Sequence, residues 1–169
     1  MLKAIISFFI WISQGFVSKF LPDGEVFPVT PTTRVIPLEQ LTKQQRLWFL
    51  VDFLENFPHW GFKFDLGAWG GFTPCGTIAC AFGWAHTIPE LKKLGLYKQH
   101  GTSFYLGHTG FFAATRFFGI SESTALEFFT PSEYRQGSKT PPKVVGHRIR
   151  TFLEDNHVPH PYTVATMCS

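Results

Sequence analysis

Apolar side chains recur at helix spacing in the stretch that begins at Thr42. The sequence Thr42-Lys43-Gln44-Gln45 precedes the apolar residues Leu47, Trp48, Leu50, Val51, Phe53 and Leu54. Residues at this spacing lie on one side of an α-helix. Thr42 and Gln45 have the spacing of a capping box, in which the two side chains satisfy backbone N–H groups of the first turn. Pro58 cannot continue a helix, so the pattern predicts one helix that ends before it.

Turn and capping residues divide the following chain into short segments. Each predicted helix has a capping residue or a proline at its start, and two have a glycine just past their end. The predicted helices are Thr77 to about Ala85, Pro89 to Leu94 before Gly95, Phe111 to Phe118 between Thr109 and Gly119, Glu122 to Phe129 after Ser121, and Pro141 to about Asn156, with Val144, Val145, Ile149, Phe152 and Leu153 inward. His59 to Phe64 suits a short strand, and Tyr97 to Gly110 suits a loop or a small hairpin.

These patterns predict a mainly α fold, a compact bundle of five or six short helices with glycine-rich loops and at most a small hairpin. Within the segment 77–85, the small residues Ala79 and Gly83, and likewise Ala81 and Ala85, are spaced by four. Two faces of this helix therefore lack bulk, and a neighbouring helix can approach closely. Glycine costs about 1 kcal/mol relative to alanine inside a helix, which a close contact at Gly83 would offset.

The residues before Pro37 differ in character from the helical body. The run from Ala4 to Ile12 is almost entirely apolar and follows Lys3, a pattern shared by signal peptides and by helices that lie on membranes or partners. The cleavage site is poor, so we favour an uncleaved apolar helix and a cytoplasmic protein, with membrane contact through residues 4–21 as an open alternative. Prolines and threonines after it predict a linker. The predicted organisation is an apolar helix and linker (1–33), a helical domain (34–156) and a flexible tail (157–169).

Composition narrows the choice of function. Hydrophobic residues make up 44% of the chain, aromatic residues 17% with 20 Phe, and charged residues 16%. This content predicts a dense aromatic core in preference to an aromatic-lined pocket. The net charge is +3 without a long basic run, so no nucleic-acid partner is indicated. The three cysteines lack disulfide-framework or zinc-site spacing and are expected to be reduced. No cofactor or metal is expected.

The most distinctive segment is Cys75-Gly76-Thr77-Ile78-Ala79-Cys80-Ala81-Phe82-Gly83-Trp84-Ala85. It has the form C-G-T-x-A-C-x-x-G-x-A and resembles a signature of small, largely uncharacterised bacterial and phage proteins. The resemblance extends over about Leu41 to Asn156, and the run Phe117-Phe118-Gly119-Ile120-Ser121 before an acidic helix resembles a second feature of that family. It implies a related fold and no particular activity. The apolar N-terminus departs from the pattern.

Cys75 is the candidate nucleophile. We expect it just before the helix 77–85, where oriented amides and the helix dipole would lower the pKa of its thiol. Cysteine-dependent hydrolases and transferases pair such a thiol with a histidine. The sequence does not choose among the available histidines, which are His59, His86, His100, His108 and His147. His86 is the second catalytic candidate, and at a helix C-terminus it would be favoured as a cation. The interpretation we favour is that Cys75 and Cys80 are small buried hydrophobes.

Asp65 and Trp69 form a second candidate site. A carboxylate in a glycine-rich loop can orient a polar group of a ligand while an indole ring stacks on it. The simpler interpretation, which we favour, is that Asp65 binds the amides of its own turn. Trp84 and Tyr105 complete the candidate ligand-binding residues.

Phosphate-loop, dinucleotide and common hydrolase motifs are absent from the sequence. We therefore favour a small binding protein of phage or mobile-element type that sequesters a small ligand or docks on a host protein, without turnover. One alternative is a cysteine-dependent hydrolase or transferase that uses Cys75 and a histidine. The other is a membrane-associated structural or interaction protein, an interpretation that depends on the apolar N-terminus.

Overall fold

The computed structural model describes residues 33–34, 36–58, 62–68, 71–73, 76–100 and 102–163. The chain divides into two units, one of Met1–Pro37 with Pro161–Ser169 and one of Leu38–His160. In the first unit, strand β1 (Thr33–Arg34) pairs antiparallel with β8 (Tyr162–Thr163). The predicted apolar helix within residues 4–21 lies outside the described residues. The helices of the described part of the chain belong to the second unit.

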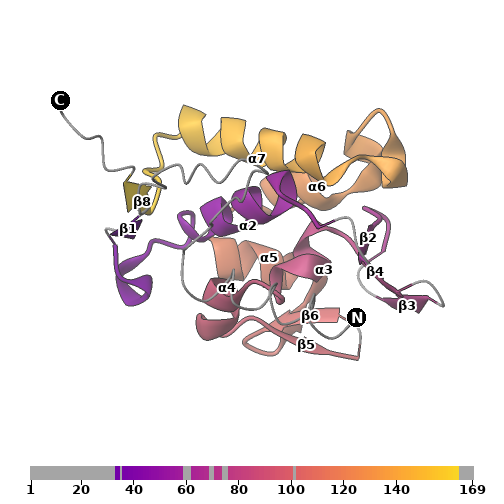
Figure 1. Cartoon of the computed structure of the whole chain (residues 1–169), viewed down its shortest axis with the longest axis horizontal. Helices are drawn as coiled ribbons and strands as arrows, with labels where there is room; N and C mark the ends of the chain where they lie inside the picture. Colours follow the sequence, from indigo (N-terminus) through magenta and orange to yellow (C-terminus); the bar gives the residue numbers. More distant parts are fainter. Residues whose placement is uncertain are drawn as a thin grey trace, which may run out of the picture. The chain divides into compact units, whose positions relative to one another are not determined.

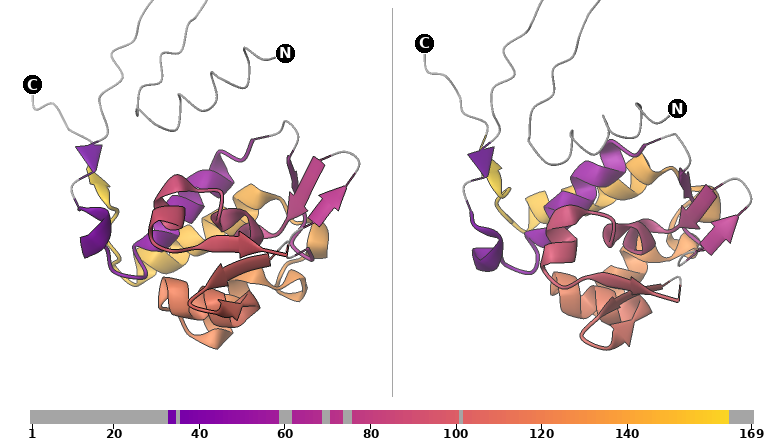
Figure 2. Two further views of the ribbon diagram at one scale, coloured as in Figure 1. Left: turned by 90° about the horizontal axis from the view of Figure 1, so that it is seen from below. Right: turned by 60° about the horizontal axis from the view of Figure 1, so that its bottom comes forward.

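The second unit is mainly helical, as predicted (Figure 1). Its described part contains the α-helices α2 (Arg46–Glu55), α3 (Ala81–Ala85), α4 (Pro89–Lys93), α5 (Gly110–Phe118), α6 (Glu122–Phe129) and α7 (Pro142–Asp155). Three short 3-10 helices accompany them: η1 (Leu38–Gln40), η2 (Pro131–Glu133) and η3 (Gly137–Lys139). Helix α2 lies between α7 on one side and α3, α4 and α5 on the other (Figures 1 and 2).

Two small sheets complete this unit. In the first, β2 (Phe62–Phe64) pairs parallel with β4 (Gly76–Ala79), and β4 pairs antiparallel with β3 (Gly71–Thr73). The second is an antiparallel sheet of β5 (Tyr97–Gln99), β6 (Thr102–Tyr105) and β7 (His108–Thr109). The short strand and the small hairpin that the sequence suggested are therefore present as β2 and β5–β7.

The prediction of a helix that starts at Thr77 is wrong. Thr77 and Ile78 lie in β4, between β2 and β3, and their β-branched side chains suit a strand. Helix α3 begins only after Cys80, which is its N-cap. All five residues of α3, including Gly83, are buried, which is the environment predicted for its small side chains.

The predicted capping box at the start of α2 is confirmed. The Thr42 N–H donates to Oε1 of Gln45 at 2.9 Å, and the Gln45 N–H donates to Oγ1 of Thr42 at 3.2 Å. The same Gln45 is buried and donates from Nε2 to the carbonyl of Pro159 at 3.2 Å. Trp48 donates from Nε1 to the carbonyl of Val158 at 3.1 Å. The start of α2 thus also binds the segment that follows α7.

Helices α2 and α7 approach each other closely at Gly146. A Cβ atom at this position would lie 3.2 Å from Cβ of Leu54 and 3.2 Å from Cγ of Glu55. One turn further along α7, Arg150 donates from Nε to Oε1 of Glu55 at 2.8 Å and from Nη2 to the other oxygen. The hydrogen bond from Arg150 lowers the pKa of the Glu55 carboxyl below its usual value. A glycine and a bidentate ion pair therefore set the distance and the register of these helices.

Fewer residues of α7 are buried than the sequence predicted. Val145, Ile149 and Leu153 are fully buried, but Val144 is 46% exposed. A helix packed along one side buries a single stripe of residues, and Val144 lies outside that stripe. The prediction that Val144 faces inward is therefore wrong.

Phenylalanine rings build the centre of the unit, as the composition predicted. The fully buried rings come from α3, α5 and α6 and are Phe82, Phe117, Phe118, Phe128 and Phe129. Phe82 meets Phe118 edge-on with ring centroids 5.9 Å apart, and Phe117 meets Phe118 at 5.0 Å. Such edge-to-face pairs contribute about 0.5–1.5 kcal/mol each beyond the area that they bury.

The predicted caps of the middle helices have mixed outcomes. Gly95 and Gly119 follow α4 and α5 with φ of +94° and +64°, the left-handed region that a C-terminal glycine supplies. Ser121 accepts a hydrogen bond from the Thr124 N–H at 3.0 Å, so the predicted N-cap of α6 is confirmed. Thr109 precedes α5 but makes no side-chain cap hydrogen bond.

A strained turn joins β6 to β7. Tyr105 pairs with His108, which leaves Leu106 and Gly107 as a two-residue loop with φ of +49° and +77°. Tight hairpins of this kind need positive φ at both positions, and asparagine, aspartate or glycine usually occupies the first. A leucine with positive φ is strained. Because the Leu106 side chain is 70% exposed, burial does not compensate for this strain.

The substitution Gly146→Leu is expected to lower the free energy of unfolding by about 2 kcal/mol or more, because the new side chain overpacks the contact with α2. The matched control Val144→Leu, at an exposed position of the same helix, should change it by less than about 0.5 kcal/mol. Urea unfolding of the two variants measures both values. Equal stabilities would contradict the close approach of α2 and α7.

The substitution Leu106→Asn is expected to raise the free energy of unfolding by about 0.5–1 kcal/mol, because asparagine adopts positive φ more readily than leucine. Leu106→Ala removes the same apolar atoms but keeps the strain, and should stay within about 0.5 kcal/mol of the parent. Thermal and urea unfolding compare the three chains. An asparagine variant less stable than the alanine variant would contradict the strained turn.

Candidate functional site

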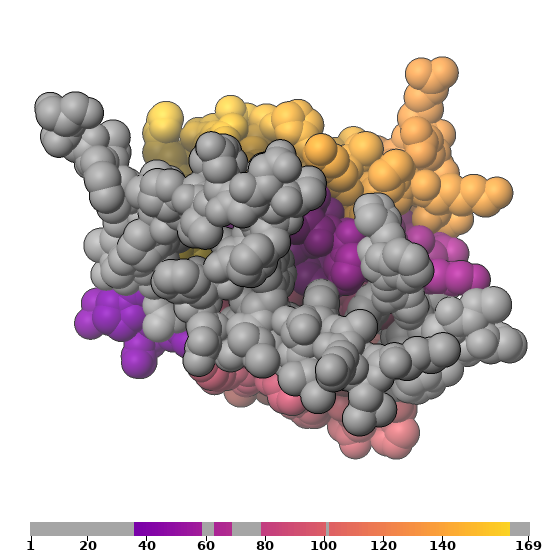
Figure 3. Space-filling view, viewed as in Figure 1, coloured from indigo at the N-terminus to yellow at the C-terminus, as the bar shows by residue number. Residues whose placement is uncertain are grey.

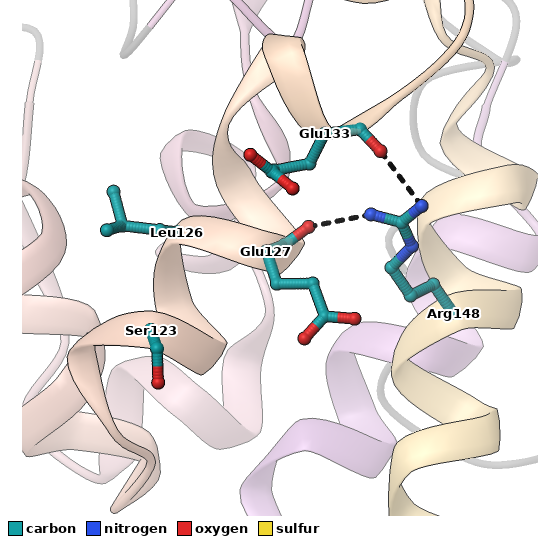
Figure 4. A pocket seen from close by; sticks show the side chains of 5 residues that line it. All are labelled: Ser123, Leu126, Glu127, Glu133 and Arg148. Carbon is teal, nitrogen blue, oxygen red and sulfur yellow. Dashed lines mark hydrogen bonds between the residues drawn. The ribbon is translucent and has the colours of Figure 1, made fainter.

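A solvent-open hollow of about 450 Å³ lies between α6, η2 and α7. Its lining residues are Ser123, Leu126, Glu127, Glu133 and Arg148 (Figure 4). The three residues from α6 are spaced by three and four positions, so they share one face of that helix. Arg148 reaches toward them from α7 (Figure 4). The hollow therefore combines two carboxylates, one guanidinium, one hydroxyl and one exposed apolar side chain.

Arg148 is held in place by backbone carbonyls. Its Nη1 donates to the carbonyl of Glu127 at 3.0 Å, and its Nη2 donates to the carbonyl of Glu133 at 2.9 Å. Both glutamate side chains are exposed and remain available as hydrogen-bond acceptors at the rim. The guanidinium thus links α7 to the ends of α6 and η2 without neutralising the two carboxylates.

The aromatic ring of Tyr134 packs against the guanidinium of Arg148. The Arg148 Cζ atom lies 4.0 Å from the centroid of the Tyr134 ring, a distance at which a cation is attracted to the ring face. The Tyr134 hydroxyl donates to the carbonyl of Phe128 at 2.8 Å. Burial raises the pKa of the Tyr134 hydroxyl well above its usual value, so at neutral pH it stays a neutral donor. The hydrogen bond to Phe128 thus fixes the ring against which the guanidinium packs.

The charged and apolar groups of the hollow suit the recognition of another molecule. Two carboxylates at the rim attract a cationic group, and Leu126 offers an apolar contact beside them. These side chains could contact a partner group in which a positive charge lies next to an apolar side chain.

The thiol at the start of α3 is that of Cys80, and it is buried. Its Sγ accepts a hydrogen bond from the Gly83 N–H at 3.3 Å, and the residue is fully buried. Burial raises the pKa of the Cys80 thiol to about 11, so the reactive thiolate is scarce at neutral pH. Cys75 itself lies outside the described residues. Because strand β4 separates it from α3, the expectation that a helix dipole activates Cys75 is not supported, and its catalytic role stays a prediction.

Asp65 serves its own turn. Its Oδ1 accepts a hydrogen bond from the Gly67 N–H at 2.8 Å, and its carbonyl accepts one from Ala68 at 3.0 Å. This is the turn role that the sequence favoured for it. Trp69, its expected partner in binding a ligand, lies outside the described residues, so that pairing stays a prediction.

Trp84 and Tyr105, the other two candidate ligand-binding residues, both pack against aromatic side chains but differ in how much of each is buried. The Trp84 side chain is buried, donates from Nε1 to the carbonyl of Lys63 at 3.3 Å, and meets Phe57 edge-on at 5.8 Å. Tyr105 is partly buried, and its ring lies edge-on to Phe117 at 4.9 Å. Neither residue lines the hollow beside α6.

His86 follows α3, and its Nδ1 lies 2.7 Å from the carbonyl oxygen of Gly83. Burial lowers the pKa of the imidazole, and the nearby positive charges of Lys98 and Lys92 lower it further. The contact with the Gly83 carbonyl, in α3 itself, acts in the opposite direction and raises the pKa, which is the effect expected at a helix C-terminus. Burial is the larger effect, so the net shift of the His86 pKa is downward.

Among the described residues, no group of three or more histidine, cysteine, aspartate or glutamate side chains is arranged to hold a metal ion. No helix in the described part of the chain has both the length and the apolar character needed to cross a membrane.

Comparisons of the chain with protein-family models, with curated proteins and with solved structures found no match. The resemblance carried by the C-G-T-x-A-C-x-x-G-x-A segment therefore stays a prediction.

We expect iodoacetamide to leave Cys80 unmodified in the folded chain at pH about 8, because its thiol is buried and mostly protonated. In guanidinium chloride the same cysteine should react at the rate of an ordinary thiol. Mass spectrometry with fragment assignment separates Cys80 from Cys75. Rapid modification of Cys80 under native conditions would contradict the buried N-cap.

Proposed function

We propose that this chain is a small helical binding protein that docks on a host protein through the hollow formed by α6, η2 and α7. The observation that carries the proposal is the pair of exposed carboxylates of Glu127 and Glu133, at a rim that is fixed by Arg148. Two carbonyls and the Tyr134 ring hold its guanidinium, so the rim is shaped before a partner arrives. Preorganised groups of this kind lose little conformational entropy on binding.

The hollow favours docking over the sequestration of a small ligand. Sites for small molecules enclose most of the ligand surface, whereas this hollow is open to solvent. Its exposed carboxylates, Glu127 and Glu133, and the apolar side chain of Leu126 suit a protein segment in which a lysine or arginine flanks an apolar residue.

The phage or mobile-element part of the proposal has a different basis. It depends on the motif from Cys75 to Ala85 and on its resemblance to small bacterial and phage proteins. Because that resemblance implies no particular activity, the docking proposal itself depends on the hollow.

An array of immobilised short peptides, each with a lysine or arginine beside a leucine or phenylalanine, tests the docking proposal. The peptides retained best are measured again in solution by fluorescence anisotropy. The double substitution Glu127→Lys with Glu133→Lys should weaken their binding about tenfold or more, because like charges then face each other.

The matched control is Glu154→Lys with Asp155→Lys, which makes the same change in net charge at exposed positions near the end of α7. It should weaken binding less than about threefold, because exposed charges beyond a Debye length are screened. Equal losses in the two double variants, or no preference for basic over acidic peptides, would overturn the proposal.

A further inference from the structure

The chain from Leu91 to Ser121 contains no acidic residue. It runs from α4 through β5, β6 and β7 to the end of α5, and it carries Lys92, Lys93, Lys98 and Arg116. Since the whole chain has a net charge of +3, these four positive charges leave the remainder of the chain slightly negative. We call this stretch the acid-free segment. An uneven charge distribution of this kind favours an anionic partner at one surface.

Exposed apolar side chains lie in the same segment. Among the described residues, Leu106 is 70% exposed and Phe112 is 65% exposed, and Tyr97 is 43% exposed. Leu126 and Val144, the other exposed large apolar residues described, are less exposed than Leu106 and Phe112. The most exposed apolar residues and the acid-free segment therefore coincide.

The pairing of β5, β6 and β7 shows which side of this sheet faces outward. Tyr97 pairs with Phe104, and Phe104 pairs with Thr109, so these three residues share one face. The other face carries Ser103, which is buried and donates to the carbonyl of Phe82 at 3.0 Å, and Tyr105, which packs on Phe117. Tyr97 and Phe104 therefore lie on the outward face, with their rings stacked 5.7 Å apart.

Helix α5 adds an outward side of its own. Phe112 and Arg116 are four positions apart and both exposed, whereas Ala113, Ala114 and Phe117 are buried. Residues four apart are neighbours on a helix, so an aromatic ring and a positive charge lie together on this side. In Figures 1 and 3 the strands β5 and β6 of the acid-free segment lie at the lower edge of the second unit, whereas α5 packs against both β6 and α6.

The turn that carries Leu106 strengthens the case for a function. Its backbone is strained for a leucine, and the side chain points into solvent, so neither turn geometry nor core packing explains a leucine there. Strained residues that do not serve the fold are concentrated at binding sites and other functional positions. An apolar side chain held out at the tip of a hairpin can enter an apolar phase without a change of the fold.

We propose that the acid-free segment forms a peripheral membrane-binding surface, in which Leu106 and Phe112 enter the headgroup region of an anionic lipid bilayer. The lysines and Arg116 would attract the anionic headgroups, and the apolar side chains would leave water at the boundary of the acyl chains. A single-stranded nucleic acid fits less well, because base stacking uses aromatic rings and would leave Leu106 unused. This surface is separate from the hollow beside α6, so the inference does not depend on the proposed function.

Vesicle flotation of the full chain tests the proposal, with vesicles of phosphatidylcholine alone and of phosphatidylcholine with phosphatidylserine. We expect binding to the anionic vesicles only, and weaker binding when salt is raised from about 0.1 M to about 0.5 M. Leu106→Asn with Phe112→Ser should reduce the bound fraction about fivefold or more. Because Leu106→Asn suits the turn, thermal unfolding should show a variant that is still folded.

The matched control, Leu126→Ser with Val144→Ser, removes two exposed apolar side chains outside the acid-free segment and should leave vesicle binding unchanged. Equal binding by the parent and both double variants would place any membrane contact elsewhere, such as residues 4–21, and would overturn the proposal. So would equal binding to neutral and anionic vesicles. Binding of a fluorescent single-stranded oligonucleotide that Tyr97→Ala and Phe104→Ala abolish, without vesicle binding, would overturn it in favour of a nucleic acid.

Discussion

The contact between α2 and α7 is the constraint on which the rest of the second unit depends. Gly146 lets the two helices approach, and the bond between Arg150 and Glu55 sets their register. The α2 helix also reaches α5, because Arg46 donates from Nη1 to the carbonyl of Phe117 at 3.0 Å. Arg148 stands two residues after Gly146, so this packing also decides where its guanidinium meets α6 and η2. The candidate site is thus a consequence of how α7 lies on α2.

Local signals in the sequence predicted the local structure well. Capping signals act within a few residues, so they can be recognised without a structure. They include the capping box of Thr42 and Gln45, the Ser121 cap and the glycines after α4 and α5. In the segment 76–79 the local signal was misleading, because threonine suits the N-cap of a helix as well as a strand. The short apolar run of this segment suits a helix or a strand, and the outcome depends on pairing with β2 and β3, which lie elsewhere in the chain. That long-range pairing decided against the predicted helix.

The candidate site was less predictable for a related reason. Glu127 and Glu133 hold Arg148 through their backbone carbonyls. Because every residue has a backbone carbonyl, the residue type does not show which one will accept a hydrogen bond. The sequence showed Arg148 only as a basic residue on the last helix. The distinctive motif drew attention to side chains that the described structure uses inside the fold, Cys80 as an N-cap and Trp84 as a packed ring. A distinctive sequence motif can therefore consist of core packing residues as well as of binding-site residues.

Charge separates the two proposed surfaces of the second unit. The hollow presents the carboxylates of Glu127 and Glu133, whereas the acid-free segment presents only positive and neutral side chains. A basic protein segment would be attracted to the hollow and repelled by the acid-free segment, and an anionic bilayer would show the reverse preference. Repulsion at the wrong surface adds to attraction at the right one, which is how a binding protein gains specificity beyond its direct contacts.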